Sequence, residues 1–444
     1  MAKWAALSTG ILRLLLALAL LRAALAWRLP LFASVRTTAL VLLLTVSIAL
    51  IAVELWTARS AFASRTTRVI GAVTLVAATC GFIATASAES EFRSARERVL
   101  NADPQRLAKL GRHIIIGYNT RADIDALMER RAIAGIFLTG AYSANKSIAA
   151  MASDIAALQA MRPRQGLPPL WVATDQEGGG VSRLSPPLPF LPTLADIIAR
   201  KSDTADREHA VAHYAKQQAR DLAAIGVNLN FAPVVDINYG TYDPTDRLTL
   251  INTRAIAKDP GTVTEVARTY CATMIRFHIH CTLKHFPGLG RVIGDTHLKP
   301  AELSAMPDEL AATDWLPFRS LMSDPNIFTM LSHARLTAID QNQPASTSHA
   351  VIEGLLRDQW KYEGILVTDD FSMGAITGTR EGVGGSAVSA LNAGVDLILV
   401  SYDPEQYYPL MDALLQADRE GRLNANALAR SDERLRRAAE VPAQ

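Results

Sequence analysis

Residues 284–297 have the sequence Lys-His-Phe-Pro-Gly-Leu-Gly-Arg-Val-Ile-Gly-Asp-Thr-His, in which a strand end, a turn and a polar loop follow one another. Lys284 and His285 lie near the end of an apolar run that predicts a β-strand, and a Pro-Gly-x-Gly turn comes next. The loop then presents Asp295 and His297. A carboxylate two residues from an imidazole can orient it and raise its basicity, so the pair is a candidate proton donor and acceptor. An isolated Asp-x-His is more often an ordinary polar loop, and the surrounding sequence has to decide between the two interpretations.

Short apolar runs and longer helical stretches alternate on both sides of this segment, which is the pattern of a parallel sheet with helical connections. Several of the runs are almost continuously apolar, as strands covered on both faces require. Eight such strands with helical connections predict an α/β fold, the (β/α)8 TIM barrel. The predicted strands are His113–Tyr118, Ala134–Thr139, Leu170–Thr174, Val227–Val235, Cys281–Phe286, Ile327–His333, Gly364–Thr368 and Val395–Ser401, with helical patterns at Glu208–Ile225, Thr262–Phe277 and Ala350–Gln359.

Polar side chains recur where these predicted strands end. In a (β/α)8 barrel the carboxyl ends of the strands meet at one face, and this face carries the chemistry. We therefore expect the active site to be built from these residues. They are Asp175, Asp236, Lys284, His285, His333, Asp369 and Tyr402.

The first 90 residues are rich in Leu, Ala, Val and Thr, whereas the remainder has the mixed composition of a globular domain. Residues 37–56 and 69–88 are apolar for 20 residues each, long enough to cross about 30 Å of hydrocarbon. Residues 10–31 form a weaker third candidate. We expect residues 1–90 to be a membrane anchor with two or three transmembrane helices, followed by a catalytic barrel over residues 91–444.

Two arginines make the first apolar stretch the weaker candidate. Arg13 could extend to a membrane interface, whereas Arg22 would need a partner or a shifted span. A cleaved signal peptide fits poorly, because further apolar stretches follow the first, although Ala-Ser-Ala at 86–88 leaves processing there as an alternative.

Arginines also bear on the orientation in the membrane. Arg59, Arg65 and Arg68 lie between the second and third stretches and favour the cytoplasm, which would place the catalytic domain outside. Other arginines favour the opposite orientation, so the expectation of an extracytoplasmic domain keeps an alternative. They are Arg28, Arg36, Arg93, Arg96 and Arg98.

The formal net charge of +2 gives no indication of a nucleic-acid partner. Cys80, Cys271 and Cys281 form neither a disulfide framework nor a metal-ligand spacing. We expect Cys271 and Cys281 to be buried free thiols on a barrel helix and the next strand. No metal or organic cofactor is expected, and the sequence does not indicate an oligomeric state.

The 284–297 segment resembles the signature of glycoside hydrolase family 3, in its β-N-acetylglucosaminidase branch. That signature is Lys-His-Phe-Pro-Gly-His-Gly, four residues, then Asp-Ser/Thr-His, and this chain departs from it at Leu289. The resemblance extends from about residue 110 to about residue 410, with four further motifs in the family's order. It implies a retaining β-N-acetylhexosaminidase that binds a carbohydrate and removes terminal β-linked N-acetylglucosamine, with peptidoglycan-derived or chitin-like saccharides as the source.

The resemblance also implies catalytic roles. Val-Thr-Asp-Asp-Phe-Ser-Met at residues 367–373 is similar to the segment that carries the family's nucleophile, which maps to Asp369. Asp370 is the alternative, but adjacent residues on a strand point in opposite directions, so only one faces the sugar. The acid and base would be His297 assisted by Asp295, in place of the second carboxylate that most glycosidases use. Glu177 is the nearest rival for that role.

Sugar binding is implied for six residues. The segment 174–183 resembles the family's Asp-Gln-Glu-Gly-Gly-Arg-Val-x-Arg, with Gly180 in place of an arginine, and Ile-Asn-Thr-Arg-Ala-Ile at 251–256 resembles a segment whose arginine contacts the sugar. We expect Asp236 to organise the site without touching substrate. The six expected sugar-binding residues are Asp175, Arg183, Arg254, Lys284, His285 and Met373.

Two alternative functions stay open on the sequence alone. The first is another member of the same family with a different sugar preference, such as a β-glucosidase. The second is a catalytically weak, membrane-bound sugar sensor, which the departures at Leu289 and Gly180 permit.

Overall fold

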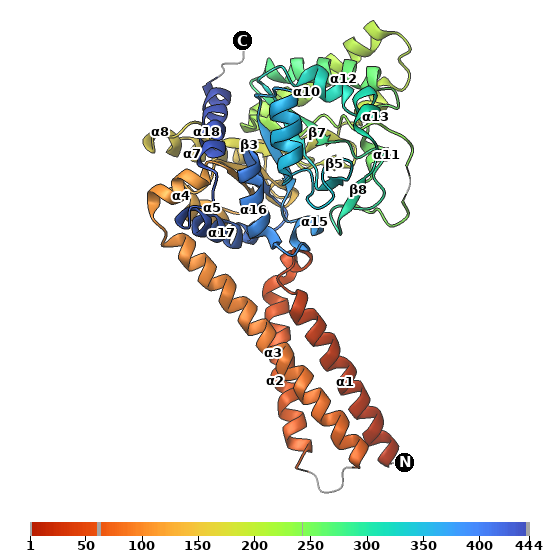
Figure 1. Cartoon of the computed structure of the whole chain (residues 1–444), viewed down its shortest axis with the longest axis vertical. Helices are drawn as coiled ribbons and strands as arrows, with labels where there is room; N and C mark the ends of the chain where they lie inside the picture. Colours follow the sequence, from red (N-terminus) through yellow and green to blue (C-terminus); the bar gives the residue numbers. More distant parts are fainter. Residues whose placement is uncertain (1, 60–63, 242, 441–444) are drawn as a thin grey trace. The chain divides into compact units, whose positions relative to one another are not determined.

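The computed structural model describes residues 2–59, 64–241 and 243–440. The chain forms two compact units, Met1–Arg98 and Val99–Gln444, and each is described by itself (Figure 1).

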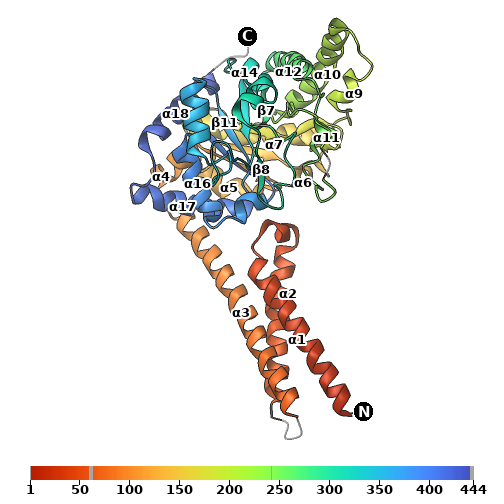
Figure 2. The same ribbon diagram turned by 45° about the vertical axis from the view of Figure 1, so that its right-hand side comes forward.

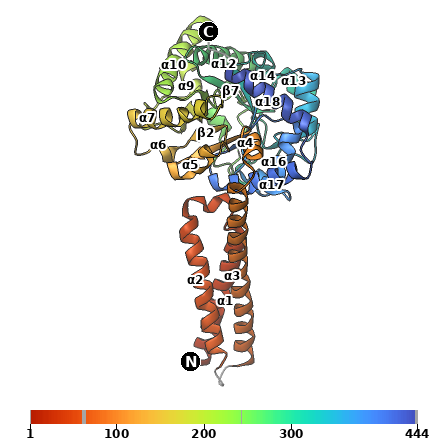
Figure 3. The same cartoon turned by 90° about the vertical axis from the view of Figure 1, so that its left-hand side faces the viewer.

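The first unit is built from helices that run side by side (Figure 3). They are α1 (Ala2–Ala26), the short 3₁₀-helix η1 (Pro30–Val35), α2 (Arg36–Thr57) and α3 (Arg65–Leu100). By length and composition, three segments could cross a membrane, namely Leu7–Ala26, Pro30–Thr57 and Arg65–Leu100.

The predicted stretch 10–31 has the wrong carboxyl end. Helix α1 stops at Ala26, and a new helical segment opens at Pro30, whose ring cannot continue an α-helix. The stretch 37–56 matches α2, and the stretch 69–88 is an internal part of the much longer α3.

Ion pairs join the helices of this unit. Arg13 of α1, which interrupts the first apolar stretch, has its Nε 3.1 Å from the Oε1 of Glu54 on α2, and Glu54 is buried. Gly71 of α3 leaves room for this carboxylate, because a Cβ there would lie 2.9 Å from the Glu54 Oε2. Arg28 pairs with Glu89. Pairing of this kind offsets part of the cost of placing charges in an apolar helix bundle.

The second unit contains the closed parallel barrel, with helices around it (Figure 2). All eight predicted strands are confirmed, and neighbours along the chain pair in parallel until the last closes on the first. In barrel order they are β1 (Ile114–Tyr118), β2 (Gly135–Leu138), β3 (Trp171–Thr174), β6 (Leu229–Asn230), β7 (His280–Phe286), β9 (Ile327–Leu331), β11 (Leu366–Asp370) and β12 (Leu397–Val400).

The predicted strand 227–235 is much shorter than expected. Only Leu229–Asn230 is regular strand, with one further parallel bridge from Val234 to Lys284. Pro233 interrupts the run because it has no N–H to donate to a neighbouring strand. Two small sheets lie outside the barrel, formed by β4 (Gln176–Gly178) with β5 (Val181–Ser182), and by β8 (Ala301–Leu303) with β10 (Ala334–Leu336).

The helices of this unit confirm the predicted helical patterns, except that 350–359 is a π-helix. They are α4 (Pro104–Gly111), α5 (Arg121–Glu129), α6 (Gly140–Ser143), α7 (Ile148–Gln159), α8 (Met161–Arg164), α9 (Leu194–Ile198), α10 (Thr204–Ile225), α11 (Ile251–Arg254), α12 (Pro260–Ile275), α13 (Pro307–Ala312), α14 (Leu316–Leu321), η2 (Ala350–Gln359), α15 (Gly374–Thr377), α16 (Gly382–Ala393), η3 (Pro404–Gln406), α17 (Tyr407–Arg419) and α18 (Ala425–Glu440).

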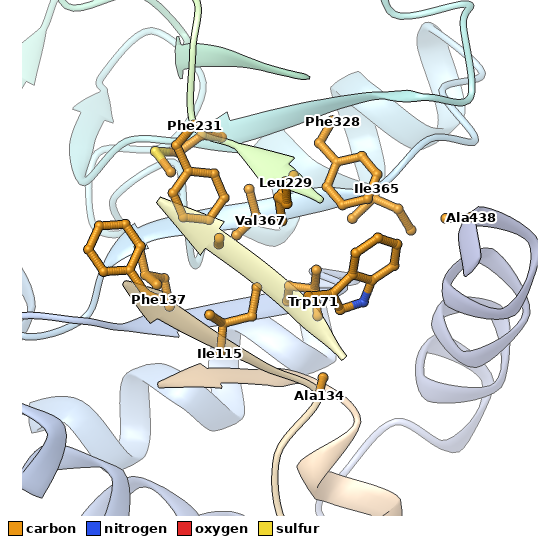
Figure 4. Close-up of a cluster of buried hydrophobic side chains, with 14 of the residues drawn as sticks. Ile115, Ala134, Phe137, Trp171, Leu229, Phe231, Phe328, Ile365, Val367 and Ala438 are labelled. Carbon is orange, nitrogen blue, oxygen red and sulfur yellow. The ribbon is translucent and has the colours of Figure 1, made fainter. Parts of the chain in front are cut away.

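Large apolar side chains fill the barrel interior (Figure 4). Phe137 stacks on Phe231 with ring centroids 5.9 Å apart, and Trp171 meets Phe328 edge to face at 5.3 Å. The barrel is therefore a packed core, and chemistry is confined to its ends.

Cys271 and Cys281 form a disulfide, so the expectation of two free thiols is wrong. The predicted places on a barrel helix and the next strand are correct, since the residues lie in α12 and β7. Their Cα atoms are 5.5 Å apart, which is within the range that a disulfide spans.

Asp396, at the start of the last barrel strand, is fully buried between two arginines. Its carboxylate accepts hydrogen bonds from Arg357 of η2 at 2.8 Å, Arg434 of α18 at 2.9 Å and the backbone N–H of Leu366 at 2.8 Å. Because these partners come from β11, η2 and α18, this carboxylate connects the final helix to the barrel.

Asp396→Asn should lower the free energy of unfolding of the full-length protein in detergent by about 3–5 kcal/mol, because it leaves two buried guanidinium groups without a counter-charge. Denaturant titration gives this value. Glu363→Gln is the matched control, since the Glu363–Arg437 pair at 3.6 Å is more than half exposed on the acid side and should contribute below about 1 kcal/mol. Equal losses in the two variants would contradict the role given to Asp396.

Candidate active site

The candidate site lies at the carboxyl ends of the barrel strands, where the sequence predicts it. Asp175 follows β3, Lys284 and His285 lie near the carboxyl end of β7, and Asp369 lies at the end of β11. Since all the strands are parallel, these side chains share one face of the barrel.

Asp295 and His297 form the predicted pair. The Nδ1 of His297 lies 2.8 Å from Asp295 Oδ1, and the same oxygen accepts from the His297 backbone N–H at 3.0 Å. Asp295 is buried, whereas about a third of the His297 side chain is exposed. With Nδ1–H donating to the carboxylate, Nε2 is the ring nitrogen left to exchange a proton with a ligand.

Sequence reasoning missed the support of this pair, which comes from residues 246–250. The Thr249 hydroxyl donates to Asp295 Oδ1 at 3.0 Å and lies 3.3 Å from His297 Nδ1. The backbone N–H groups of Arg247 and Leu248 donate to Asp295 Oδ2 at 3.3 and 3.1 Å. A local signal exists, because Asp246 accepts from the next turn in the way that Asp residues initiate turns.

These donors set the electrostatics of Asp295. Burial alone would raise the pKa of its carboxyl group. The hydrogen bond and charge of His297, together with the Thr249 hydroxyl, outweigh burial and hold the pKa well below its usual value. Asp295 is therefore an anion that orients the imidazole over the whole neutral range.

Asp369 and Asp370 have different environments. Asp370 is buried, and its carboxylate accepts from the Ser372 and Ser401 N–H groups at 2.9 Å, the Ser401 hydroxyl at 2.7 Å and the Tyr402 N–H at 2.8 Å. Its oxygens are occupied by the backbone after β12. Asp369 is only partly buried, and its carboxylate accepts a hydrogen bond from the Asp370 N–H at 2.8 Å. Asp369 is therefore the carboxylate that could meet a ligand.

Three imidazoles influence Asp369. Burial would raise the pKa of its carboxyl group, but His285, His333 and His297 outweigh this and lower it. His333 is a buried neighbour without an expected catalytic role; its Nδ1 lies 2.7 Å from the Ser346 hydroxyl and its Nε2 3.0 Å from the Asp370 carbonyl. Burial lowers the pKa of His333. The result is an ionised Asp369 at neutral pH.

The segment after Asp369 also holds the loop that carries His297. The Gly374 N–H donates to the His297 carbonyl at 2.7 Å, and the Ala375 N–H donates to the Thr296 carbonyl at 3.1 Å. Gly374 has to be glycine, because a Cβ would lie 2.3 Å from the Leu298 carbonyl oxygen. Met373, an expected sugar-binding residue, is buried just before α15.

The expected sugar-binding charges are brought together, but as ion pairs with one another. The Lys284 ammonium is buried 2.9 Å from Asp175 Oδ1 and 2.5 Å from Glu177 Oε1. Arg254 binds Glu177 through two hydrogen bonds of 2.7 and 2.9 Å. Glu177 therefore holds two cations in place, and this anchoring role differs from that of a free catalytic acid. Asp175 is the more exposed of the two acids and the one open to a ligand.

His285 is fixed by Asp236, the expected organiser. Asp236 accepts from His285 Nδ1 at 2.7 Å, from the His285 N–H at 3.2 Å and from the Leu289 N–H at 2.6 Å. The Nε2 of His285 lies 3.3 Å from an Arg254 guanidinium nitrogen. Since Arg can only donate, Nε2 accepts and Nδ1 carries the proton.

Leu289 and Gly180 are the two residues at which this chain departs from the family motifs. Leu289 is buried in an apolar cluster that includes Val234 and Ile251. Gly180 is exposed, and no heavy atom lies within 4 Å of a Cβ built there. The position therefore accepts either glycine or arginine. Arg183, the arginine retained from that motif, is half exposed and 3.9 Å from Asp175. Within residues 2–59, 64–241 and 243–440, no group of three or more His, Cys, Asp or Glu side chains could hold a metal ion.

Comparisons with known proteins show the family to which the chain belongs. Residues 105–438 match the family model described as the glycosyl hydrolase family 3 N terminal domain. The chain is 30% identical over 328 residues to the β-hexosaminidase LpqI of Mycobacterium tuberculosis, covering 73% of this chain and 80% of LpqI. It is 33% identical over 303 residues to a β-hexosaminidase of Stenotrophomonas maltophilia, covering 68% of this chain and 84% of that protein.

A solved structure of a family 3 β-N-acetylglucosaminidase from a Paenibacillus species is also similar. Its TM-score is 0.68 at 30% identity, and the match covers 76% of this chain and 63% of that longer chain. The chain therefore belongs to glycoside hydrolase family 3, and to the branch of that family whose members are named β-hexosaminidases.

Proposed function

We propose that this protein is a retaining β-N-acetylhexosaminidase that uses Asp369 as the nucleophile and His297, oriented by Asp295, as the acid and base. The observation that carries the proposal is that a carboxylate and a carboxylate-oriented imidazole lie on the same face of the barrel. An accessible, ionised carboxylate lies at the end of β11, and the segment that follows it holds the loop of a carboxylate-oriented imidazole through two backbone hydrogen bonds.

The proposed reaction has two displacements. In the first, an Asp369 oxygen attacks the anomeric carbon while the protonated His297 gives its Nε2 proton to the departing glycosidic oxygen. This forms a covalent glycosyl-enzyme and releases the aglycone. In the second, His297 takes a proton from water, the hydroxide attacks the same carbon, and Asp369 leaves. The two inversions retain the β configuration. Asp295 orients the imidazole through its Nδ1 and supplies a counter-charge beside it.

The proposed substrate carries terminal β-linked N-acetylglucosamine, from peptidoglycan-derived or chitin-like saccharides. The names of the related proteins support an N-acetylhexosamine at the cleaved position. Asp175, Arg254, Lys284 and His285 are proposed to surround that sugar, with Arg183 and Met373 at its edge. The β-glucosidase alternative has no observation in its favour. The sensor alternative is weakened because the sequence contains every proposed catalytic residue.

We further propose that the first unit anchors the enzyme in a membrane with the second unit on the extracytoplasmic side. The three apolar helices support anchoring. The Cys271–Cys281 disulfide supports the orientation, since disulfides persist mainly in oxidising compartments. The arginines between the second and third apolar stretches agree with it.

The sugar preference and the nucleophile are tested together with the full-length protein in detergent. It should hydrolyse an aryl β-N-acetylglucosaminide much faster than the matching aryl β-glucoside, and Asp369→Ala should lose at least about 10³ of that activity, because it removes the proposed nucleophile. The hydrolysis rates of both substrates, measured with both proteins, test the sugar preference and the nucleophile assignment. Near-normal turnover by the variant would remove the nucleophile assignment, and a preference for glucoside would move the enzyme to another branch.

The acid role is tested through the leaving group. His297→Ala should lower kcat/KM by roughly 10² or more for a poor leaving group and by less for a good one, which departs without a proton. Thr249→Val should show the same dependence at about a tenth of normal kcat/KM, because the hydroxyl only positions Asp295 and His297.

Thr249→Ser is the control, because it keeps the hydroxyl and should stay within about threefold of the natural enzyme. Initial rates on a series of aryl glycosides measure the effect. Losses that do not vary with the leaving group would contradict an acid role for His297 and a positioning role for Thr249.

A further inference from the structure

The exposed apolar side chains of the second unit gather on the active-site face. Among its described residues, every large apolar or aromatic side chain that is more than half exposed belongs to one set, which we call the apolar rim. Its members are 53 to 71% exposed. They are Phe190, Leu248, Ile293, Leu298, Met306 and Tyr402.

The position of the apolar rim follows from the barrel topology. Phe190 lies in the connection after β3 and the β4–β5 hairpin, and Leu248 lies after β6. Ile293 and Met306 lie after β7, and Tyr402 lies after β12. All these segments leave the carboxyl ends of parallel strands, so they surround the face that carries Asp369 and His297. Isolated exposed apolar residues are normal, but their concentration on one face indicates a contact surface.

Exposed cations are interleaved with the apolar rim. Arg247 precedes Leu248, Lys299 follows Leu298, and Arg380 lies on the segment after β11. Exposed acids lie among them too: Glu302 pairs with Arg335 and Glu309 with Arg291, while Asp308 and Glu381 are exposed near Met306 and Arg380. Apolar side chains interleaved with charged ones suit the headgroup region of a bilayer.

The length of the connection limits how far the second unit extends from a membrane. Helix α3 continues from the end of the apolar stretch at residue 88 to Leu100, which adds about 18 Å, and α4 begins at Pro104. With the first unit in a membrane, as proposed above, a connection of this length allows the apolar rim to reach a bilayer surface.

We propose that the apolar rim contacts the bilayer and that the substrate is a β-linked N-acetylglucosaminide carried on a membrane lipid. This inference rests on the proposed hydrolysis and on the membrane anchor. A sugar carried on a lipid would lie at the level of the headgroups. Contact of the apolar rim with the bilayer around that sugar would bring Asp369 to the glycosidic bond. Contact with lipid buries the rim and adds the attraction of its cations to anionic headgroups.

The kinetic test uses the full chain in lipid nanodiscs of mixed zwitterionic and anionic lipids. Two substrates with the same primary-alcohol leaving group are compared, octadecyl β-N-acetylglucosaminide within the bilayer and propyl β-N-acetylglucosaminide in water. The double variant Phe190→Ser with Met306→Ser should lose about tenfold in initial rate on the octadecyl substrate and stay within about twofold on the propyl substrate. Leu167→Ser, at a part-exposed apolar site in the loop that leads into the amino end of β3, should change neither rate.

The outcomes separate the two proposals. No hydrolysis of either substrate by the natural enzyme refutes the proposed function itself. Normal propyl hydrolysis with an octadecyl rate that the rim variant does not lower refutes the membrane-contact proposal alone. Equal losses on both substrates also refute it, since the rim would then serve the soluble sugar.

A spectroscopic measurement reports contact without depending on activity. In a Cys80→Ser background, a nitroxide attached after Met306→Cys should collide more with dissolved oxygen than with a water-soluble nickel complex, as lipid-facing labels do. A label after Leu167→Cys, in the loop that leads into the amino end of β3, should show the reverse. Aqueous behaviour at both positions would overturn the proposal.

Discussion

A buried ammonium group, that of Lys284, is the point on which the site depends. A cation at this depth is stable only with counter-charges, and Asp175 and Glu177 supply them from the connection after β3. Glu177 in turn binds Arg254, which contacts His285, which is fixed by Asp236. Charge on Arg254 and Lys284 outweighs the effect of burial and lowers the pKa of Glu177. The connections after β3, β6 and β7 are thus joined by one network of charges, the kind of preorganisation that electrostatic catalysis requires.

The acid–base pair is built differently, on a loop supported from two sides. Thr249 and the adjacent N–H groups hold Asp295 from the connection after β6, and Gly374 and Ala375 hold the loop backbone from the segment after β11. The loop therefore contacts both the connection after β6 and the segment of the proposed nucleophile. A displacement of either support would alter the distance between His297 and the glycosidic oxygen, on which proton transfer depends.

The sequence predicted the barrel well because its evidence is local: a buried parallel strand is a short apolar run, and polar residues after such runs mark one face. It predicted the contact between Asp295 and His297 for the same reason, because the two residues are only two positions apart in the chain. What it missed depends on how separate elements pack against one another. Thr249 meets Asp295 across 46 residues, Lys284 meets Asp175 across 109, and Cys271 pairs with Cys281 because α12 packs beside β7. The end of the first apolar stretch was missed because Pro30 opens a new helical segment there.

Covalent trapping tests the central claim, that Asp369 is a nucleophile on this face of the barrel. The full-length protein would be incubated with a fluorinated N-acetylglucosaminyl fluoride, which forms a glycosyl-enzyme faster than water can release it, and then digested and analysed by mass spectrometry. The predicted result is one glycosyl group per chain, attached within the peptide that contains residues 369–370 and localised by fragmentation to Asp369. A sugar attached to Asp370, Glu177 or any other residue, or full turnover with inversion and no adduct, would contradict the assignment.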